Sequence, residues 1–213
     1  MLFEMQMTLG YTPSTLRTSK VTFIGKMGKE DYTLPKSFRP ISLTPFIFKL
    51  LERIGSWYII HKTLKHNPLN RRQHAYRTGK CTESAISQVL NQIEKGLLNR
   101  SYTLACFIDI SSAFDRLDPS KAIKSLIAKG VPVTIANWYE NYLKKRYLHI
   151  TIKDITVTRS ISVGCPQGGV LSTILWDLAF DNLLNLFTRG KVICVGYADD
   201  GSLLMSHDNL NYL

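Results

Sequence analysis

The chain has 213 residues, of which 45% are hydrophobic and 20% charged, enough for one large folded domain or two small ones. Lysine and arginine number 27 against 16 aspartate and glutamate residues, which gives a formal net charge of +11. That charge favours a polyanionic partner such as nucleic acid, although a solvated basic surface would also account for it.

The cysteines and the most apolar segments argue against several other classes of protein. The four cysteines lie far apart, with no C-x-x-C pair and no histidine at zinc-ligand spacing, so a reduced, intracellular chain is expected. The start, MLFEMQMTLG, has no basic region, and the most apolar window, residues 41–60, is interrupted by Lys49, Glu52 and Arg53. Neither a signal peptide nor a membrane span is therefore predicted.

The first half of the chain is predicted to hold one short strand and two long helices. VTFI, residues 21–24, is typical of a strand and runs into a basic loop rich in Gly, Lys and Pro. Thr44 is expected to cap a helix that Pro45 opens, and a second helix is expected to begin near Thr82 after a basic connector. The apolar faces at helical spacing are Phe46, Ile47, Leu50, Leu51, Ile54 and Trp57 in the first helix, and Ala85, Ile86, Val89, Leu90, Ile93 and Leu97 in the second.

The second half alternates between strands and helices. YTLACFIDI, residues 102–110, is a nearly continuous apolar run, so we expect it in the middle of a covered sheet with Asp109 at its end. The remaining expected elements are a helix from Asp118-Pro119 to Gly130, a helix opened by Pro132, a hairpin that turns at Lys153-Asp154, an apolar helix from about Val170 to Phe187, and a second hairpin, KVICVGYADDGSLLM.

Three aspartates stand where these strands end. A turn at residues 198–201 would let Asp199 and Asp200 project from a hairpin tip, and a neighbouring strand would bring Asp109 beside them. Three adjacent carboxylates repel one another and stay ionised only with cations among them. Oxygen ligands alone select hard metals, usually Mg²⁺, and two such ions about 3.5–4 Å apart promote in-line displacement at phosphorus.

Each aspartate also has a purely structural interpretation. An aspartate at a strand end, such as Asp109, is often a turn or cap residue, and Asp200-Gly201 is a common hairpin turn. Asp115 and Asp118 fit helix capping better than catalysis.

Five segments, taken in order, resemble the reverse transcriptase domain of non-LTR retrotransposons, especially the jockey-like LINE group. They are FRPISLTPFIFKLLERI, QHAYRTGKCTESAI, FIDISSAFDRLD, GCPQGGVLSTILWDLAFDNLL and YADDGSLL, and only about the first twenty residues lie outside the match. The resemblance implies an α+β fold, with polymerase fingers over residues 1–98 and a palm over residues 99–213. We expect an antiparallel palm sheet with helices packed on one face, cut off after the YADD hairpin and without a thumb.

The resemblance also implies a role for individual residues. Asp109 and Asp199 would be catalytic metal ligands, with the Ile110 carbonyl as a further ligand and Asp200 as a supporting carboxylate. Phe114 would pack under the incoming sugar and disfavour a ribose 2′-OH. The other implied positions are Gln167 and Gly168 along the nucleotide and template, Tyr197 near the primer end, and Arg39, then Lys80 and Arg77, on the triphosphate.

The implied function is RNA-directed DNA polymerisation from dNTP and a DNA primer on an RNA template, with two Mg²⁺ ions or Mn²⁺ as a substitute. The same resemblance implies a nuclear location and no membrane partner, and leaves the oligomeric state open. The chain departs from the family at Gly25 and Thr173, where relatives usually have proline, which should loosen a turn and a helix start. The alternatives are an inactive remnant that at most binds nucleic acid, and a palm polymerase of another lineage, which FRPISL and GCPQGG together disfavour.

Overall fold

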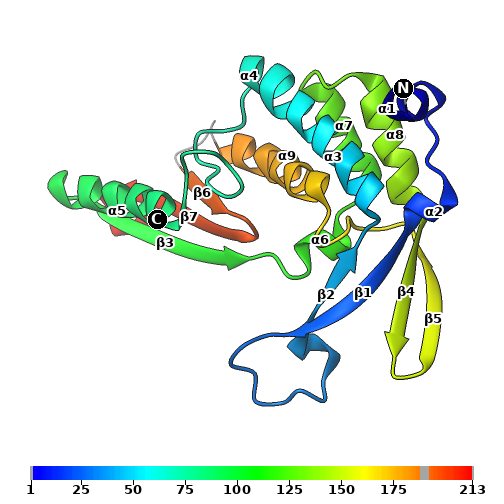
Figure 1. Ribbon diagram of the computed structural model, residues 1–213. Coiled ribbons are helices and arrows are strands. Elements are labelled where there is room, and N and C mark those ends of the chain that lie inside the picture. The colour runs from blue at the N-terminus through cyan, green and yellow to red at the C-terminus, as the bar shows by residue number, and fades with distance from the viewer. Residues whose placement is uncertain (1, 188–191, 213) are drawn as a thin grey trace. The chain divides into compact units, whose positions relative to one another are not determined.

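The computed structural model describes residues 2–187 and 192–212, and its backbone divides into two compact units (Figure 1). Unit 1 comprises Met1–Asn67 and Phe114–Leu175, and unit 2 comprises Pro68–Ala113 and Trp176–Leu213. The predicted division into fingers and palm at residue 98 is a division by function, and it stays a prediction.

The sheet of unit 1 has the strand order β2-β1-β4-β5. β1 pairs antiparallel with β2 and parallel with β4, and β4 and β5 form the predicted hairpin. The turn of this hairpin is tight because Lys153 adopts a left-handed conformation with φ 53°. The bounds are β1 Thr18–Gly25, β2 Phe38–Leu43, β4 Arg146–Ile152 and β5 Ile155–Ile161, with the short helix η1 at Pro35–Ser37.

The helices of unit 1 enclose a core of aromatic side chains. Phe48 and Tyr142 stack with their ring centroids 4.0 Å apart, and Trp138 and Tyr139 complete the cluster. All four side chains are buried, so this cluster is the main apolar core of the unit. The helices are α1 Leu2–Leu9, α2 Ser14–Arg17, α3 Phe46–Tyr58, η2 Ile59–Thr63, α4 Leu64–His66, α6 Ala113–Arg116, α7 Pro119–Ala128 and α8 Val133–Lys144.

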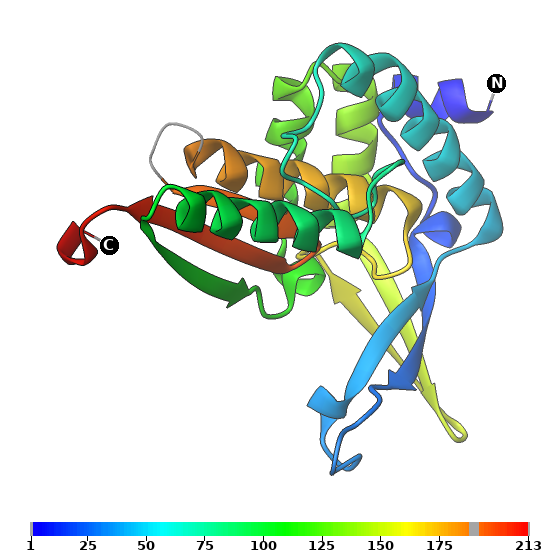
Figure 2. The ribbon, with the colours of Figure 1, turned by 90° about the vertical axis from the view of Figure 1, so that its left-hand side faces the viewer.

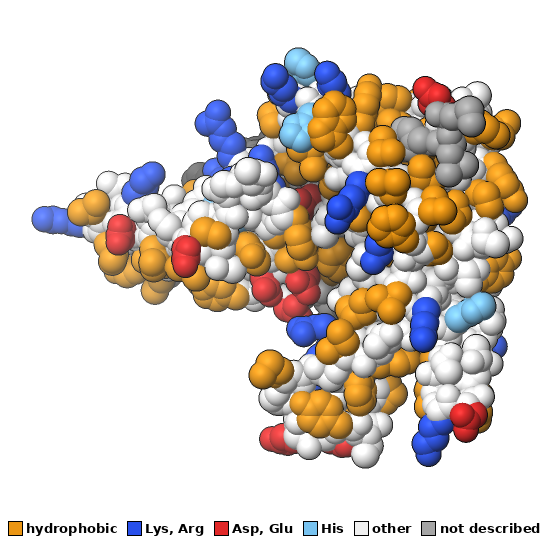
Figure 3. Space-filling model, in the orientation of Figure 1, with side chains coloured by type: hydrophobic (Ala, Val, Ile, Leu, Met, Phe, Trp, Pro, Cys, Tyr) orange, Lys and Arg blue, Asp and Glu red, His pale blue; other side chains and the backbone are white. Residues whose placement is uncertain are grey.

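Helix α3 turns a different face to the core from the one that its large apolar residues suggest. Its buried residues are Phe48, Leu51, Glu52 and Gly55. A Cβ at Gly55 would lie 3.6 Å from the Leu171 side chain, an ordinary contact distance, so Gly55 belongs to a packed face that a count of large apolar residues does not detect. Much of the predicted apolar face is exposed, namely Phe46, Ile47, Leu50, Ile54 and Trp57. Figure 3 shows hydrophobic side chains gathered over α3.

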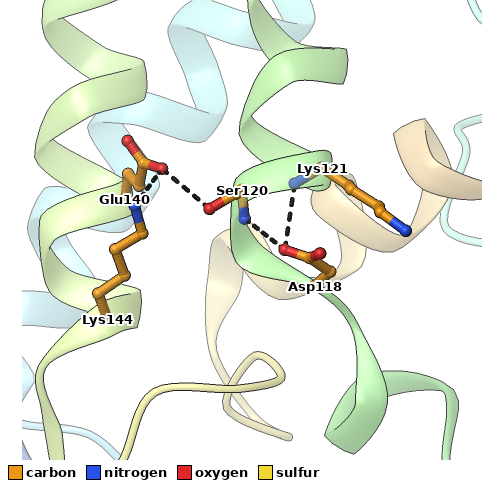
Figure 4. Close-up of polar contacts among 5 residues, drawn as sticks. All are labelled: Asp118, Ser120, Lys121, Glu140 and Lys144. Carbon is orange, nitrogen blue, oxygen red and sulfur yellow. Dashed lines mark hydrogen bonds and ion pairs between the residues drawn. The ribbon is translucent and has the colours of Figure 1, made fainter.

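Capping was predicted correctly at α7 and incorrectly at α3. The Asp118 carboxylate accepts hydrogen bonds from the backbone N–H groups of Ser120, at 2.9 Å, and Lys121, at 3.3 Å (Figure 4). Ser120 also donates to Glu140 of α8, which ties α7 to α8. At α3 the N-cap residue is Pro45, one residue later than predicted, and the buried Thr44 hydroxyl has no hydrogen-bond partner in the described structure.

Unit 2 contains an antiparallel sheet with the strand order β3-β7-β6. Its strands are β3 Tyr102–Asp109, β6 Ile193–Tyr197 and β7 Asp200–His207. β7 is the central strand, so the prediction that residues 102–110 occupy the middle of the sheet is wrong. The apolar run is not covered as that prediction required, because Tyr102, Leu104 and Phe107 are exposed within the described structure.

The two faces of this sheet contact different helices. α5 (Thr82–Leu98) packs on one face, where its Ala85 lies against Val195 and Leu204 (Figure 2). On the other face Gly196 and Gly201 are cross-strand partners, and a Cβ on Gly196 would collide with the ring of Phe180 in α9 (Val170–Phe187). Helices therefore contact both faces, which corrects the expectation that they pack on one face only.

Helix α9 is long and apolar enough, by length and composition, to cross a membrane. It nevertheless carries two buried carboxylates with hydrogen-bond partners in the same unit. Asp177 accepts from the Gln73 side chain at 2.8 Å, and Asp181 accepts from the Asn70 backbone N–H at 2.5 Å. These partnerships, and the burial of 56% of the helix, are typical of the core helix of a globular protein.

Candidate active site

The β6–β7 hairpin has a two-residue turn, Ala198-Asp199, between the paired residues Tyr197 and Asp200. Ala198 has φ 55°, the left-handed conformation that such a tight turn requires. The turn is shorter than the predicted one at residues 198–201, because Gly201 lies inside β7. Asp200-Gly201 is therefore not a hairpin turn, and that structural interpretation of Asp200 is excluded.

The third predicted aspartate lies beside this turn. Asp109, the last residue of β3, is the register partner of Asp200, the first residue of β7. The backbone N–H of Ile110 donates to the Asp199 carbonyl at 3.1 Å, which joins the end of β3 to the turn. The sheet of unit 2 therefore brings the backbone positions of all three aspartates together.

The three carboxylates are not used for capping within the described structure. None of them accepts a hydrogen bond from another described residue, unlike Asp118, which caps α7. Burial, together with the negative charges of Asp199 and Asp109, raises the pKa of Asp200. The tip of the hairpin thus carries uncompensated negative charge, the property expected of a cation site.

The chemistry of these donors fits a hard divalent cation, because every candidate ligand is an oxygen atom. Among residues 2–187 and 192–212, however, no group of three His, Cys, Asp or Glu side chains is gathered closely enough to hold a metal ion. Within the described structure the backbone positions of the three aspartates are therefore adjacent, whereas their side chains do not form a closed metal site.

Tyr76 is a residue of this region that the sequence patterns did not single out. It has φ 53°, an uncommon conformation for a large side chain, and the residue is 53% exposed. Burial raises the pKa of its hydroxyl, and the charges of Asp199 and Asp177 raise it further, which places Tyr76 near the hairpin tip. Its only signal in the sequence is an aromatic residue within a basic connector.

Arg77 and Lys80, predicted to bind the triphosphate, organise the loop that holds Tyr76. Arg77 donates to the carbonyls of Asn70, at 2.7 Å, and Gln73, at 3.2 Å, and Lys80 donates to the carbonyl of Arg71. The loop is joined to β6 by two backbone hydrogen bonds of 2.9 Å, from His74 to Gly196 and from Gly196 to Arg72. The two cations thus lie in the same unit as the aspartates, and their nucleotide contacts stay a prediction.

The other predicted nucleotide residues belong to unit 1. The Gln167 carbonyl accepts from the Ser42 N–H at 2.8 Å, which places the GCPQGG loop beside β2, the strand that carries the exposed Arg39. Gly168 has φ 108°, and a Cβ there would lie 3.1 Å from the Ser42 carbonyl, so the close approach requires glycine. The Phe114 carbonyl accepts from Cys165 at the start of the same loop.

Glu52 is a second residue that the sequence analysis did not assign to the site. It was noted there only as a charge that interrupts an apolar window. In the structure its side chain is completely buried, and its carboxylate contacts the backbone at the end of the GCPQGG loop. A single glutamate inside an apolar helical segment was the available signal.

A hairpin with carboxylates at its tip, beside a strand that ends in another carboxylate, resembles the palm of a template-directed nucleic acid polymerase. The sequence profile of the family described as "Reverse transcriptase (RNA-dependent DNA polymerase)" matches residues 24–210. The chain belongs to this reverse transcriptase family, whose members generally use a divalent metal ion.

Curated relatives come from non-LTR retrotransposons, as the sequence resemblance predicted. The chain is 30% identical over 207 residues to the 115 kDa protein of type-1 retrotransposable element R1DM of Drosophila melanogaster, a match that covers 96% of this chain and 19% of that protein. It is 28% identical over 217 residues to the RNA-directed DNA polymerase from mobile element jockey of Drosophila funebris, covering 96% and 23%. The chain thus spans about a fifth of the length of these relatives.

Solved structures support the same α+β polymerase fold. Telomerase from Candida tropicalis, in complex with the TWJ fragment of telomeric RNA, matches with a TM-score of 0.63 at 12% identity, over 94% of this chain and 38% of that one. The apo enzyme, truncated from its C-terminal domain, matches with a TM-score of 0.61 at 13% identity, over 94% and 45%. At this level of identity the likeness concerns the fold alone.

Proposed function

We propose that this chain carries the polymerase site of a retrotransposon reverse transcriptase, which joins a dNTP to a DNA primer 3′-OH on an RNA template. The observation that carries the proposal is the pairing of Asp109 with Asp200, with Asp199 in the adjacent turn and no protein partner for any of the three carboxylates in the described structure. The names of the family and of the curated relatives support RNA as the template.

The aspartates would hold the divalent cations. In our proposal Asp109 and Asp199 are the principal ligands, the Ile110 carbonyl adds an oxygen atom, and Asp200 keeps the local charge negative. Two Mg²⁺ ions, or Mn²⁺ in their place, would lower the pKa of the primer hydroxyl and neutralise the leaving pyrophosphate. Tyr197, the register partner of Asp200, would contact the primer end.

The remaining predicted residues would bind the nucleotide. The Gln167 side chain makes no hydrogen bond to another described residue, so its amide is available to a base or sugar, and Gly168 lets the nucleotide approach the backbone. We propose that Phe114 packs under the sugar. Arg39, Arg77 and Lys80 would neutralise the triphosphate, and the net charge of +11 would favour the RNA–DNA hybrid.

The test is incorporation of dTTP on poly(rA)/oligo(dT) with Mg²⁺ by the wild-type chain, Asp199→Ala and the control Glu94→Ala. Glu94 is exposed on α5 and lies outside the proposed site. Loss of a metal ligand should lower the rate by at least about a hundredfold, whereas the control should match the wild type. Activity that survives in Asp199→Ala would contradict the proposal.

The rival function is binding of nucleic acid by an inactive remnant, which the net charge of +11 favours. A remnant would bind an RNA–DNA hybrid equally well with and without Mg²⁺, and equally well after Asp199→Ala, while incorporating no dTTP. A nuclear location stays a prediction from the family resemblance.

A further inference from the structure

The helix that follows the GCPQGG loop begins without a capping side chain of its own. The N–H groups in the first turn of a helix have no acceptor inside the helix, and a Ser, Thr, Asp or Asn at the N-cap usually supplies one. Here the residue before α9 is Gly169. A Cβ on Gly169 would lie 2.7 Å from the Ser172 hydroxyl and 2.9 Å from the Pro166 ring, so no capping side chain fits there.

Glu52 of α3 supplies the missing acceptor from a distant part of the sequence. One carboxylate oxygen accepts from the Val170 N–H at 3.1 Å, and the other accepts from the Leu171 N–H at 3.4 Å. The second oxygen also accepts from the Tyr139 hydroxyl at 2.9 Å. A negative charge at the N-terminus of a helix is favourable, so the carboxylate both caps α9 and fixes it to α3 and α8.

The GCPQGG loop, which precedes this cap in the sequence, is held at several other points of its backbone. Ser42 donates to the Gln167 carbonyl at 2.8 Å, and the Ser172 hydroxyl donates to the Pro166 carbonyl at 2.8 Å. The Cys165 N–H donates to the Phe114 carbonyl at 2.8 Å. The backbone is therefore fixed at both ends, while the Gln167 side chain keeps its hydrogen-bonding groups free within the described structure.

We infer that Glu52 is the positioning residue that sets the GCPQGG loop, and with it Gln167, in the orientation that receives the incoming nucleotide. This inference rests on the proposed function of the site. Glu52 does not touch the nucleotide in this account; it acts through the N–H groups of Val170 and Leu171. An uncharged side chain of similar size would fill the same space but would cap α9 more weakly.

The surroundings of Glu52 make its charge sensitive to pH. The described titratable and charged groups that interact with it are Lys49 on α3, Tyr139 and Tyr142 on α8, and Cys165 in the loop. Burial raises the pKa of Glu52 to about 7, against the lowering effects of its hydrogen bonds and of Lys49. Ionisation of Glu52 as the pH rises through neutrality strengthens its own hydrogen bonds to the Val170 and Leu171 N–H groups, although burial of the charge lowers the stability of the whole fold.

The test uses the full chain with Glu52→Gln and the matched control Glu94→Gln, and it measures two properties that need no catalysis. Amide hydrogen exchange reports on the N–H groups of Val170 and Leu171. The Kd of dTTP is measured on poly(rA)/oligo(dT) whose primer ends in a dideoxynucleotide. Glu52→Gln should speed the exchange and raise the Kd, each by about tenfold, and the control should change neither.

A purely structural role of Glu52 would leave the pH dependence of nucleotide affinity the same in the wild type and in Glu52→Gln. For the wild type, the Kd of dTTP should fall between about pH 6 and about pH 8, and Glu52→Gln should make that fall smaller. If Glu52→Gln fails to fold, Tyr139→Phe is the second variant, because it keeps the carboxylate and removes one of its donors. Because the hydrogen bond from Tyr139 lowers the pKa of Glu52, Tyr139→Phe should raise that pKa and with it the pH at which dTTP affinity improves.

Unchanged exchange or unchanged dTTP affinity in folded Glu52→Gln would overturn the inference. A wild-type chain that binds no dTTP would refute both this inference and the proposed function. A wild-type chain that binds dTTP with the predicted dependence on Glu52, yet incorporates none, would refute the proposed function alone.

Discussion

Asp109 and Asp200 are cross-strand partners at the point where β3 ends and β7 begins. Partners of this kind have Cβ atoms about 4.5–5.5 Å apart, so two like charges placed there repel unless a cation lies between them. No turn or cap in the described structure uses either carboxylate. The pairing therefore lowers the stability of the fold, and in our proposal a bound cation would relieve this repulsion.

Substituting Asp109→Asn should lower the pKa of Asp200, because the negative charge of Asp109 contributes to raising it. The same variant should not unfold more readily than the wild type, since it removes repulsion. Carboxyl ¹³C shifts followed against pH would give the pKa, with Asp154→Asn, in the β4–β5 turn of unit 1, as the control. An unchanged pKa of Asp200 would show that the two carboxylates do not interact.

Stability should fall as the pH rises through neutrality, because two buried carboxylates have raised pKa values. The pKa of Glu52 is raised from 4.5 to about 7, and that of Asp177 from 3.8 to about 7, in both cases mainly by burial. Folding favours the protonated forms of both groups. Their contribution to the free energy of unfolding is therefore complete below the pKa values of the unfolded chain and is lost as the pH passes about 7.

For Glu52 the free energy of unfolding should fall by about 3 kcal/mol between a pH well below 4.5 and a pH well above about 7. Urea unfolding at about pH 5 and about pH 8 would measure it, and Glu52→Gln should remove its share of the difference. A free energy of unfolding that rises over this range in the wild type, or a slope that Glu52→Gln leaves intact, would count against a raised pKa.

Adding a methyl group at Gly196 should destabilise unit 2 by about 1–3 kcal/mol, because the new Cβ would overlap the Phe180 ring. The double variant Gly196→Ala/Phe180→Leu should recover part of that loss by opening space on the same face of the sheet. Denaturant unfolding of the two single variants and the double variant gives the coupling energy. Strict additivity of the two substitutions would mean that the two side chains do not meet.

Replacing Arg39 with alanine should raise the KM for dTTP by about tenfold, if its exposed guanidinium binds the triphosphate. Lys95→Ala, which removes an exposed cation from α5, is the control and should leave the KM unchanged. An equal rise in both variants would instead indicate a general effect of net charge on binding of the hybrid.

The sequence predicted the elements that are marked by local signals. Asp118-Pro119, Pro132 and Lys153-Asp154 begin or turn their elements where expected, because caps, prolines and tight turns act over a few residues. The three aspartates were found in the same way, since each stands directly after or before an apolar run.

What the sequence did not predict depends on contacts between distant segments. The buried face of α3 includes Gly55 and Glu52, which hydrophobic periodicity does not detect because one is small and the other is charged. The edge position of β3 depends on pairing order, which an apolar run does not encode. The contact of Glu52 with the start of α9 joins segments 118 residues apart, which no local pattern encodes.

Mn²⁺ binding is the most direct test of a metal site at the hairpin tip. It would be followed by electron paramagnetic resonance of free Mn²⁺, in the wild type and in Asp109→Asn/Asp199→Asn. We expect the wild-type chain to bind Mn²⁺ at a site that the double variant lacks, with both proteins folded to the same extent. Equal binding by the two proteins, or no binding by the wild type in the presence of primer, template and dTTP, would contradict a metal site at the hairpin tip.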